Sequence, residues 1–327
     1  MKNLNHMTVS VVIELDNAAF NGGAMWAKNV NTLLKWMADS AEVNVVEVFI
    51  THSQNYSNLV VSYMEQLPVK WIDRVSPLSL EKEDAHYYVM KNIAANKAVG
   101  EVVVFLDCDL TPTHGSFKEL VEPVYRENQV VSCGHTFFPT KNFISKSYSL
   151  FWYFPLYHNL KTIGKNQLHA SNVVVNKDWF LKTGFEMQHG GFKVCCFLLA
   201  QRVRKEGYSI QHPDVWFQHE LWNPSVNFFI WRALVGGRDH DKKFAIINSK
   251  CHFVRLNAAG KSLIQDIKRV YNRHINFRHT VQLRRGEAIL SFFFSVCFFS
   301  LLRASQAKSA LFALNNNPEV VPRNFIT

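Results

Sequence analysis

Short apolar runs alternate with segments of helical periodicity over the first 110 residues. Runs of strand length occur at Val9–Leu15, Val43–Ile50 and Val102–Leu106, with a weaker one at Val69–Ile72. Between them, the spacing of apolar residues predicts helices after Gly22-Gly23, at Leu59–Gln66 and at Tyr87–Ala98, the last closed by Gly100. This alternation predicts an α/β fold in which helices pack on a mostly parallel sheet.

Beyond Pro112 the predicted elements are more mixed. We expect helices at Phe117–Arg126 and Phe192–Glu206, and short strands at Val130–Cys133, Leu168–Val175, Ser209–Gln211 and Val215–His219. Gly184-Phe185 predicts a turn, and Gly207-Tyr208 ends the second helix. The aromatic stretch Phe143–Leu160 has two interpretations: a core or interface helix broken near Pro155, or a surface that faces an acceptor or a membrane.

The last third of the chain is basic and contains the apolar run Ala288–Leu302. As a helix this run extends for about 22 Å, which is short of the roughly 30 Å of a bilayer's hydrocarbon core. We therefore expect a buried helix or one that lies in the membrane interface, and the flanking arginines favour the interface. Residues 241–327 are predicted to form a helical, partly apolar C-terminal extension with peripheral membrane contact through Ala288–Leu302.

The amino-acid composition limits the kinds of molecule that this chain is expected to bind. With 48% hydrophobic residues, the 327-residue chain can bury a substantial core. Lys and Arg outnumber Asp and Glu by 36 to 26, which favours anionic partners such as nucleotides, phosphorylated lipids or acidic membranes. Because the excess is not gathered in one run, we expect no nucleic-acid partner.

Cysteine usage and the N-terminus bear on the compartment. The six cysteines have no zinc-ligand spacing, which indicates a reducing environment. The opening MKNLNHMTVSVVIEL lacks the apolar segment of a secretory signal. We expect a cytoplasmic protein, or one at the inner face of the membrane.

Two aspartates, Asp107 and Asp109, directly follow the apolar strand Val102–Leu106. In open α/β sheets, ligands bind in the crevice outside the carboxyl ends of the strands. Carboxylates one residue apart on a turn can both reach a hard divalent cation, because oxygen donors suit Mg²⁺ or Mn²⁺. The pattern therefore predicts a metal or ligand site at this strand end.

Four blocks, taken in order, resemble glycosyltransferase family 2, whose members are inverting enzymes on the GT-A fold. They are VSVVIELDN, YYVMKNIAANKAVGEVVVFLDCDLTP, LHASNVVVNKDWFLKTGF and RVRKEGYSIQHPDVWFQHE. The second block is the most specific, and the likeness covers Thr8–Arg238. The resemblance implies a GT-A type nucleotide-diphospho-sugar transferase domain over residues 8–240.

The resemblance implies metal-dependent sugar transfer from a nucleotide-sugar. Asp109, and more weakly Asp107, would hold Mg²⁺ or Mn²⁺ against the donor's pyrophosphate, with His219 as a further ligand. The ion would act as a Lewis acid on the leaving nucleoside diphosphate. Taken alone, His219 would more often be an ordinary, partly buried histidine, and its place after a short strand makes the two interpretations equal.

Further residues match the donor side of the family's site. Glu14 and Asn17 would lie beside the nucleoside, Lys91 or Asn92 near the donor, and Arg238 at the diphosphate. Lys91 and Arg238 also fit roles that involve no ligand: Lys91 as a solvated helix residue, and Arg238 as part of a charged loop. The second strand ends in FITH where the family usually has an aspartate that contacts the base, so Thr51 or His52 takes that place.

At the position of the catalytic base, this sequence departs more seriously from the family's pattern. An inverting transfer needs a group that removes the acceptor hydroxyl's proton, and the family has a Glu-Asp pair at the start of the helix before Arg-x-x-x-x-Gly-Tyr. Those positions are Cys195-Cys196, or Phe192-Lys193 if Gly190-Gly191 sets the alignment. Glu186, Asp214 and Glu220 are the nearest acids, and Glu186 is our first choice.

Three functions remain open. The first is a transferase that acts on a glycan or lipid-linked acceptor in polysaccharide biosynthesis, non-processive because the Q-x-x-R-W signature is absent. The second, favoured by Cys195-Cys196, is a catalytically silent GT-A protein that binds a nucleotide-sugar or acts as a scaffold. The third, a nucleotidyltransferase, is a poor match, because the Gly22-Gly23 loop has no nearby Lys or Arg.

Overall fold

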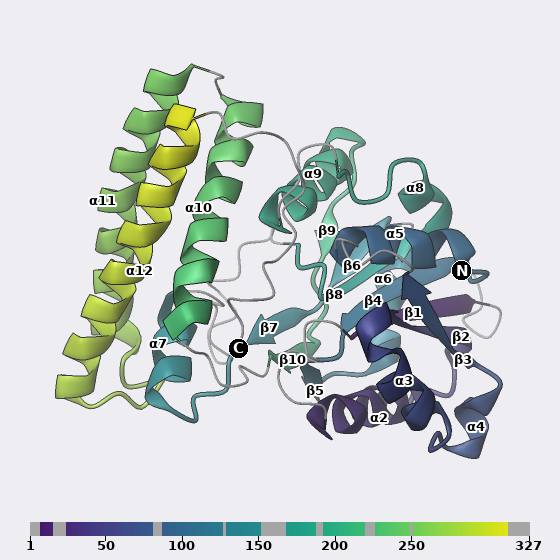
Figure 1. Ribbon diagram of the computed structural model, residues 1–327. Coiled ribbons are helices and arrows are strands. Elements are labelled where there is room, and N and C mark those ends of the chain that lie inside the picture. Colours follow the sequence, from purple (N-terminus) through teal and green to yellow (C-terminus); the bar gives the residue numbers. More distant parts are fainter. Residues whose placement is uncertain are drawn as a thin grey trace. The chain divides into compact units, whose positions relative to one another are not determined.

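The computed structural model describes residues 7–15, 24–80, 87–126, 129–151, 168–187, 192–219, 226–248 and 251–312. The chain forms two compact units (Figure 1). The first comprises Met1–Thr136, Gly164–Glu186 and Leu198–Trp222, and the second comprises Phe137–Ile163, Met187–Phe197 and Asn223–Thr327. Helix α9 (Phe192–Lys205) therefore contributes residues to both units.

A seven-stranded sheet with the order β3-β2-β1-β4-β8-β6-β9 organises the first unit. Its strands are β1 (Thr8–Glu14), β2 (Asn44–Ser53), β3 (Val75–Leu80), β4 (Val102–Asp107), β6 (Val131–Cys133), β8 (Asn172–Asn176) and β9 (Ile210–Gln211). Strands β3, β2, β1 and β4 are parallel neighbours, whereas β8 runs antiparallel to β4 and β6. The predicted mostly parallel sheet flanked by helices is confirmed.

Both faces of the sheet are covered. The helices of this unit include α2 (Ala24–Ala38), α3 (Ser57–Met64), α5 (Tyr87–Lys97), α6 (Phe117–Arg126) and α8 (Lys177–Leu181). On one face, Val11 and Val104 share a core with Leu33 of α2. On the other, the ring of Phe105 lies 5.3 Å from that of Phe180 on α8. Burial on both sides explains why these strands are continuous apolar runs without alternation.

A second, three-stranded sheet follows the aspartates. Its order is β5-β10-β7, formed by β5 (Leu110–His114), β10 (Trp216–His219) and β7 (His135–Phe137). β5 begins one residue after Asp109, and antiparallel pairing with β10 aligns Leu110 with His219. This sheet brings a segment more than a hundred residues away in sequence beside the Asp-x-Asp turn.

The prediction of a strand at Val69–Ile72 is wrong. These residues form the short helix α4, which follows Pro68 and buries only Trp71, while the 3₁₀ turn η2 (Gln54–Tyr56) and α3 precede it. The third strand is β3, which the sequence concealed because Pro77 lies within it. Proline is tolerated there because β3 is an edge strand, where one side of the backbone has no ladder partner.

The prediction that Gly100 closes the helix as its C-cap is wrong. Helix α5 ends at Lys97, and Gly100 is not among the described glycines with a positive φ. A Cβ atom at Gly100 would lie 2.5 Å from the backbone nitrogen of Ser10. The glycine is needed because the chain passes against β1 at this point, and its N–H donates to the Ser10 hydroxyl.

The second unit is helical. It contains α7 (Phe143–Phe151), α10 (Val226–Ile247), α11 (His252–Phe277) and α12 (Arg285–Phe312). Rings of Tyr148, Phe151, Phe229 and Phe298 contact one another across α7, α10 and α12. Thus the described part of the predicted aromatic stretch is a core helix, whereas residues 152–160 lie outside the described residues. The predicted domain boundary at residue 240 falls inside α10.

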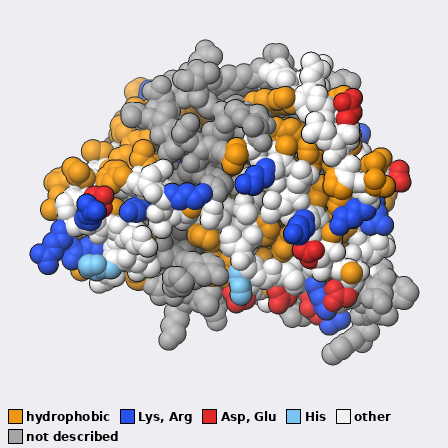
Figure 2. Space-filling view, turned by 90° about the horizontal axis from the view of Figure 1, so that it is seen from below, with side chains coloured by type: hydrophobic (Ala, Val, Ile, Leu, Met, Phe, Trp, Pro, Cys, Tyr) orange, Lys and Arg blue, Asp and Glu red, His pale blue; other side chains and the backbone are white. Residues whose placement is uncertain are grey.

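Helix α12 is longer than the apolar run Ala288–Leu302 that predicted it. It has 28 residues and is the one described helix long and apolar enough to cross a membrane, judged by length and composition alone. Its most apolar window is 44% buried within the protein, and a core helix of a soluble protein can pass the same test of length and composition. Lys and Arg side chains lie at several separate places on the face shown in Figure 2, as expected from their scattered positions in the sequence.

Candidate active site at the carboxyl edge of the sheet

Three parallel strands end side by side at the carboxyl edge of the large sheet, and each brings a polar side chain there. Glu14 of β1 pairs with Thr51 of β2 on one side and with Asp107 of β4 on the other. All three residues are buried. The structure therefore brings together three of the residues predicted to lie on the donor side.

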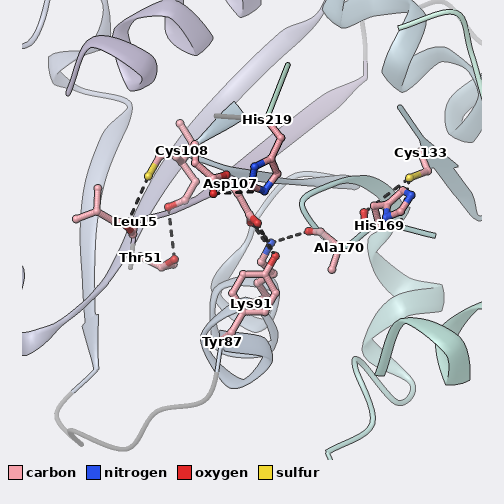
Figure 3. A network of polar contacts seen from close by, with 12 residues as sticks. Leu15, Thr51, Tyr87, Lys91, Asp107, Cys108, Cys133, His169, Ala170 and His219 are labelled. Carbon is pink, nitrogen blue, oxygen red and sulfur yellow. Dashed lines mark hydrogen bonds and ion pairs between the residues drawn. The ribbon is translucent and has the colours of Figure 1, made fainter. Parts of the chain in front are cut away.

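Asp107 is bound on both oxygens by side chains of α5. The hydroxyl of Tyr87 donates to Oδ1 at 2.8 Å and to Oδ2 at 2.9 Å, and Lys91 Nζ donates to Oδ1 at 2.7 Å (Figure 3). Burial, reinforced by the negative charge of Asp107, raises the pKa of Tyr87 well above its ordinary value. The phenol therefore remains a hydrogen-bond donor to Asp107 at physiological pH.

Lys91 also connects the aspartate to the segment before β8. Its side chain is completely buried, and Nζ donates a second hydrogen bond, of 2.6 Å, to the carbonyl of Ala170. The backbone N–H of Asp107 donates to the carbonyl of the next residue, Ser171, at 2.8 Å. Lys91 is thus a buried structural cation, and the alternative of a solvated helix residue is wrong.

Asp109 and His219 form the second part of the site. Nε2 of His219 lies 3.5 Å from Oδ2 of Asp109, as expected from the pairing of His219 with Leu110. Asp109 is 5% exposed, and its Oδ1 has no hydrogen-bond partner among the described residues. A buried carboxylate oxygen without a partner is costly, so this atom is suited to receive a cation or a donor from a ligand.

The pKa of Asp109 reflects this environment. Burial raises the pKa of its carboxyl to about 6, while the nearby His219 opposes the rise and the charge of Asp107 adds to it. Asp107 and Asp109 have different charged partners, although only one residue separates them. Asp107 forms an ion pair with Lys91, whereas Oδ2 of Asp109 lies 3.5 Å from Nε2 of His219.

A divalent cation fits Asp109 and His219 only as a partial ligand set. No group of three His, Cys, Asp or Glu side chains in the described parts of the chain is arranged to hold an ion by itself. Mg²⁺ is commonly bound through one or two carboxylates together with substrate phosphates and water. The pair therefore suits an ion that arrives with a phosphorylated ligand.

The other predicted donor-side residues are placed as follows. The hydroxyl of Thr51 donates to the carbonyl of Ile13, which keeps it within the sheet. The amide of Asn92 holds both backbone groups of Phe185, with distances of 2.8 and 2.9 Å. Arg238 is half-buried on α10 of the second unit, where burial lowers the pKa of its guanidinium. Asn17 lies outside the described residues.

Residues 20–184, just over half of the chain, match the sequence profile of glycosyl transferase family 2. The chain belongs to glycosyl transferase family 2. This match includes Asp107 and Asp109, whereas Glu14 and His219 lie outside the matched residues. No curated protein matches the chain significantly.

Solved structures share the fold of this family 2 chain. The structure of GalNAc-T7 with UDP, GalNAc and Mn²⁺ matches with a TM-score of 0.54 at 14% identity, over 78% of this chain and 51% of that one. The mannosyltransferase PcManGT from Pyrobaculum calidifontis, in complex with GDP-Man and Mn²⁺, matches with a TM-score of 0.56 at 12% identity, over 94% and 88%. The chain thus spans about half the length of the GalNAc-T7 structure. The predicted GT-A type fold is confirmed.

The acids considered as the base of a family 2 enzyme occupy different places. Asp214 accepts hydrogen bonds from Trp216 and His114, and these partners lower the pKa of its carboxyl. Trp216 and His219 are the two ends of β10, so Asp214 lies beyond the end that is remote from the Asp109 pair. Glu186 directly follows Phe185, whose backbone Asn92 fixes, and Glu220 lies outside the described residues.

The cysteines at the family's acid positions provide no carboxylate. Both lie in α9, where Cys195 is fully buried and its Sγ is 3.9 Å from Sδ of Met187. A buried thiol in such surroundings behaves as a small hydrophobic side chain.

Tyr87 belongs to the candidate site but is not among the residues predicted for it. The sequence predicts it only as the first residue of a helix, yet it contacts both oxygens of Asp107. The available signal was its spacing: Tyr87 lies four residues before Lys91, so both side chains project from the same face of one helix.

Proposed function

We propose that this chain transfers a glycosyl group from a nucleoside diphosphate sugar to a glycan or lipid-linked acceptor, with inversion and without processive synthesis. The observation that supports this most is the buried Asp109 oxygen without a partner beside His219, at the carboxyl edge of the sheet of a family 2 chain. Mg²⁺ or Mn²⁺ would be held by Asp109 and His219 together with the donor's diphosphate, in keeping with the Mn²⁺ and nucleotides of the two solved structures.

In this proposal the site residues have separate roles. The bound cation would supply Lewis acidity toward the leaving diphosphate. Glu14 and Thr51 border the nucleoside. A role of Arg238 at the diphosphate stays a prediction from the family resemblance. Asp107 lines the donor site as a polar side chain whose charge is balanced by Lys91. Asn92 acts indirectly, because it fixes the backbone next to Glu186.

We assign Glu186 as the general base of the transfer. Its support is positional: the carboxylate follows a backbone segment fixed to α5, the helix whose Lys91 binds Asp107. Glu186→Gln should lower the rate of sugar transfer by about 10²–10⁴-fold and leave donor affinity unchanged. Glu101→Gln, on an exposed residue before β4, is the matched control. Full activity of Glu186→Gln would remove this assignment.

The catalytically silent protein is the second candidate, and the buried Cys195 supports it. The two proposals are separated by incubating the protein with Mn²⁺ and a panel of UDP- and GDP-sugars. Release of nucleoside diphosphate supports the transferase. Binding of a donor at micromolar concentration, with no turnover in the presence of acceptors, supports the silent form.

A further inference from the structure

Helix α12 departs from the polarity pattern that is usual for a helix on the surface of a soluble protein, although Phe298, Phe299 and Leu302 are buried. Its exposed positions include large apolar side chains: Ile289, Leu290, Phe293, Leu301, Leu311 and Phe312. Its buried positions include polar ones: Ser291, Ser295, Arg303, Ser305, Gln306 and Ser309. In water, the apolar stripe of a helix faces the core and the polar stripe faces solvent.

The buried polar side chains are paired across the helices of the second unit. Arg303 of α12 donates to Asp266 of α11 at 2.8 Å and to Gln306 at 2.6 Å. Ser309 donates to Asp241 of α10 at 2.7 Å, and Asp241 also binds Arg255 of α11. These bonds fix the rotation of α12 against α10 and α11. The apolar face is therefore held on the outside.

This outward face has the dimensions of a lipid-facing surface. From Ile289 to Phe312 it extends for about 34 Å at 1.5 Å per residue, and Lys308 is the one charged side chain exposed within it. Helix α11 adds a second apolar stripe of exposed side chains spaced eleven, seven and four residues apart: Phe253, Ile264, Tyr271 and Ile275. These spacings place the four side chains on one side of the helix.

Basic residues lie beside the apolar stripe of α11. Lys261, Lys268 and Arg269 are exposed on this helix, and Arg284 and Arg285 are exposed where the chain turns into α12. Residues 251–312 contain ten Lys or Arg and two Asp or Glu. Of the two acids, Asp266 is buried against Arg303 and Glu287 accepts from the backbone of Arg284. On the side of α11 and α12, at the left of Figure 2, Lys and Arg side chains lie next to hydrophobic ones.

We propose that α11 and α12 form a platform that lies in the interface of a bilayer containing anionic lipids. The apolar faces of both helices would enter the acyl boundary, and the basic stripe of α11 would meet the headgroups. A span across the bilayer is disfavoured, because it would place Lys261 and Lys268 in hydrocarbon. A second copy of the chain is disfavoured as occupant, because a symmetric contact would bring two surfaces of the same charge together.

The platform is independent of the proposed transferase chemistry and is tested by flotation of the full-length protein with vesicles. We expect binding to phosphatidylcholine vesicles that contain phosphatidylglycerol, and about tenfold weaker binding to phosphatidylcholine alone. Leu290→Glu/Phe293→Glu, at two exposed sites, should weaken binding to the anionic vesicles at least tenfold. Val69→Glu, at an exposed apolar site on α4 of the first unit, should leave binding unchanged.

A charge variant and a solution measurement complete the test. Lys261→Gln/Lys268→Gln/Arg285→Gln should weaken binding to the anionic vesicles several-fold and should make its decrease with added salt smaller. Failure of the parent protein to float with any vesicle would overturn the proposal. So would a dimer in solution that Leu290→Glu/Phe293→Glu converts to a monomer, because the face would then be covered by a second copy. Donor hydrolysis with Mn²⁺, measured on the same variants, reports on the transferase separately.

Discussion

Lys91 Nζ donates a 2.7 Å hydrogen bond to Oδ1 of Asp107, and the lysine side chain is completely buried. Because of this contact, the two aspartates have different roles. Asp107 has its charge balanced inside the protein, whereas Asp109 retains an oxygen without a partner among the described residues. The Asp-x-Asp turn therefore combines a structural acid with one that is open to a ligand.

Removing the buried cation should destabilise the fold. Lys91→Met leaves the carboxylate of Asp107 buried with Tyr87 as its remaining partner on α5 and leaves the Ala170 carbonyl without its lysine donor. Loss of one member of a buried pair costs about 3–5 kcal/mol, which chemical denaturation would measure as a fall in the free energy of unfolding. Lys97→Met, at an exposed position of the same helix, should change that energy by less than about 0.5 kcal/mol. Equal stability of both variants would show that the Lys91 contact contributes little.

Asp109 should reduce stability at neutral pH. Burial raises the pKa of its carboxyl from 3.8 to about 6, so the folded state binds more protons than the unfolded state between these values. The unfolding free energy therefore falls as pH rises through this window, by roughly 3 kcal/mol at 1.36 kcal/mol per pKa unit. In metal-free buffer, Asp109→Asn should be more stable than the parent above pH 6, and this advantage should disappear near pH 4. A constant difference across the range would contradict the assignment.

The same titration should govern metal affinity. A cation binds the ionised carboxylate, so protonation of Asp109 below about pH 6 competes with the ion. We expect the affinity for Mn²⁺ in the presence of UDP or GDP to fall about tenfold per pH unit below this value, as measured by calorimetry. An affinity that is unchanged from pH 7 to pH 5 would mean that Asp109 does not bind the ion.

Two glycines of the helical unit should respond to alanine with opposite signs. A Cβ atom at Gly237 of α10 would lie 2.7 Å from Cβ of Ser305, against the backbone of α12. Gly237→Ala should therefore separate these helices and lower the free energy of unfolding by about 1–3 kcal/mol. Gly260 of α11 has open space around it, so Gly260→Ala should raise stability by up to about 1 kcal/mol. Thermal unfolding of both variants measures the two effects.

Much of the fold was predictable because the strands are buried on both faces. The runs Val9–Leu15, Val43–Ile50 and Val102–Leu106 contain most of β1, β2 and β4, and the direction of these strands locates the carboxyl edge of the sheet. Strand β3 escaped prediction because Pro77 and two serines interrupt its apolar pattern. Its position at the sheet edge makes these residues acceptable, and edge position is a tertiary property.

Only the residues at the ends of the parallel strands could be assigned to the site from the sequence. The register of parallel strands places Glu14, Thr51 and Asp107 together, whereas the ion pair of Lys91 depends on how α5 packs. No periodicity distinguishes a buried lysine that binds an aspartate from one that faces solvent. For α12, the sequence pattern showed the apolar run but not that Ser and Arg side chains face inward.

Asp109 is proposed to hold a divalent cation for a nucleotide-sugar donor, and calorimetry can test this role. Calorimetric titration of UDP- and GDP-sugars with and without Mn²⁺ compares the parent protein with Asp109→Asn. Because this variant is expected to be the more stable one at neutral pH, a loss of binding would not reflect unfolding. We predict Mn²⁺-dependent donor binding by the parent and its loss in Asp109→Asn. Unchanged Mn²⁺-dependent binding by the variant would contradict the proposed site.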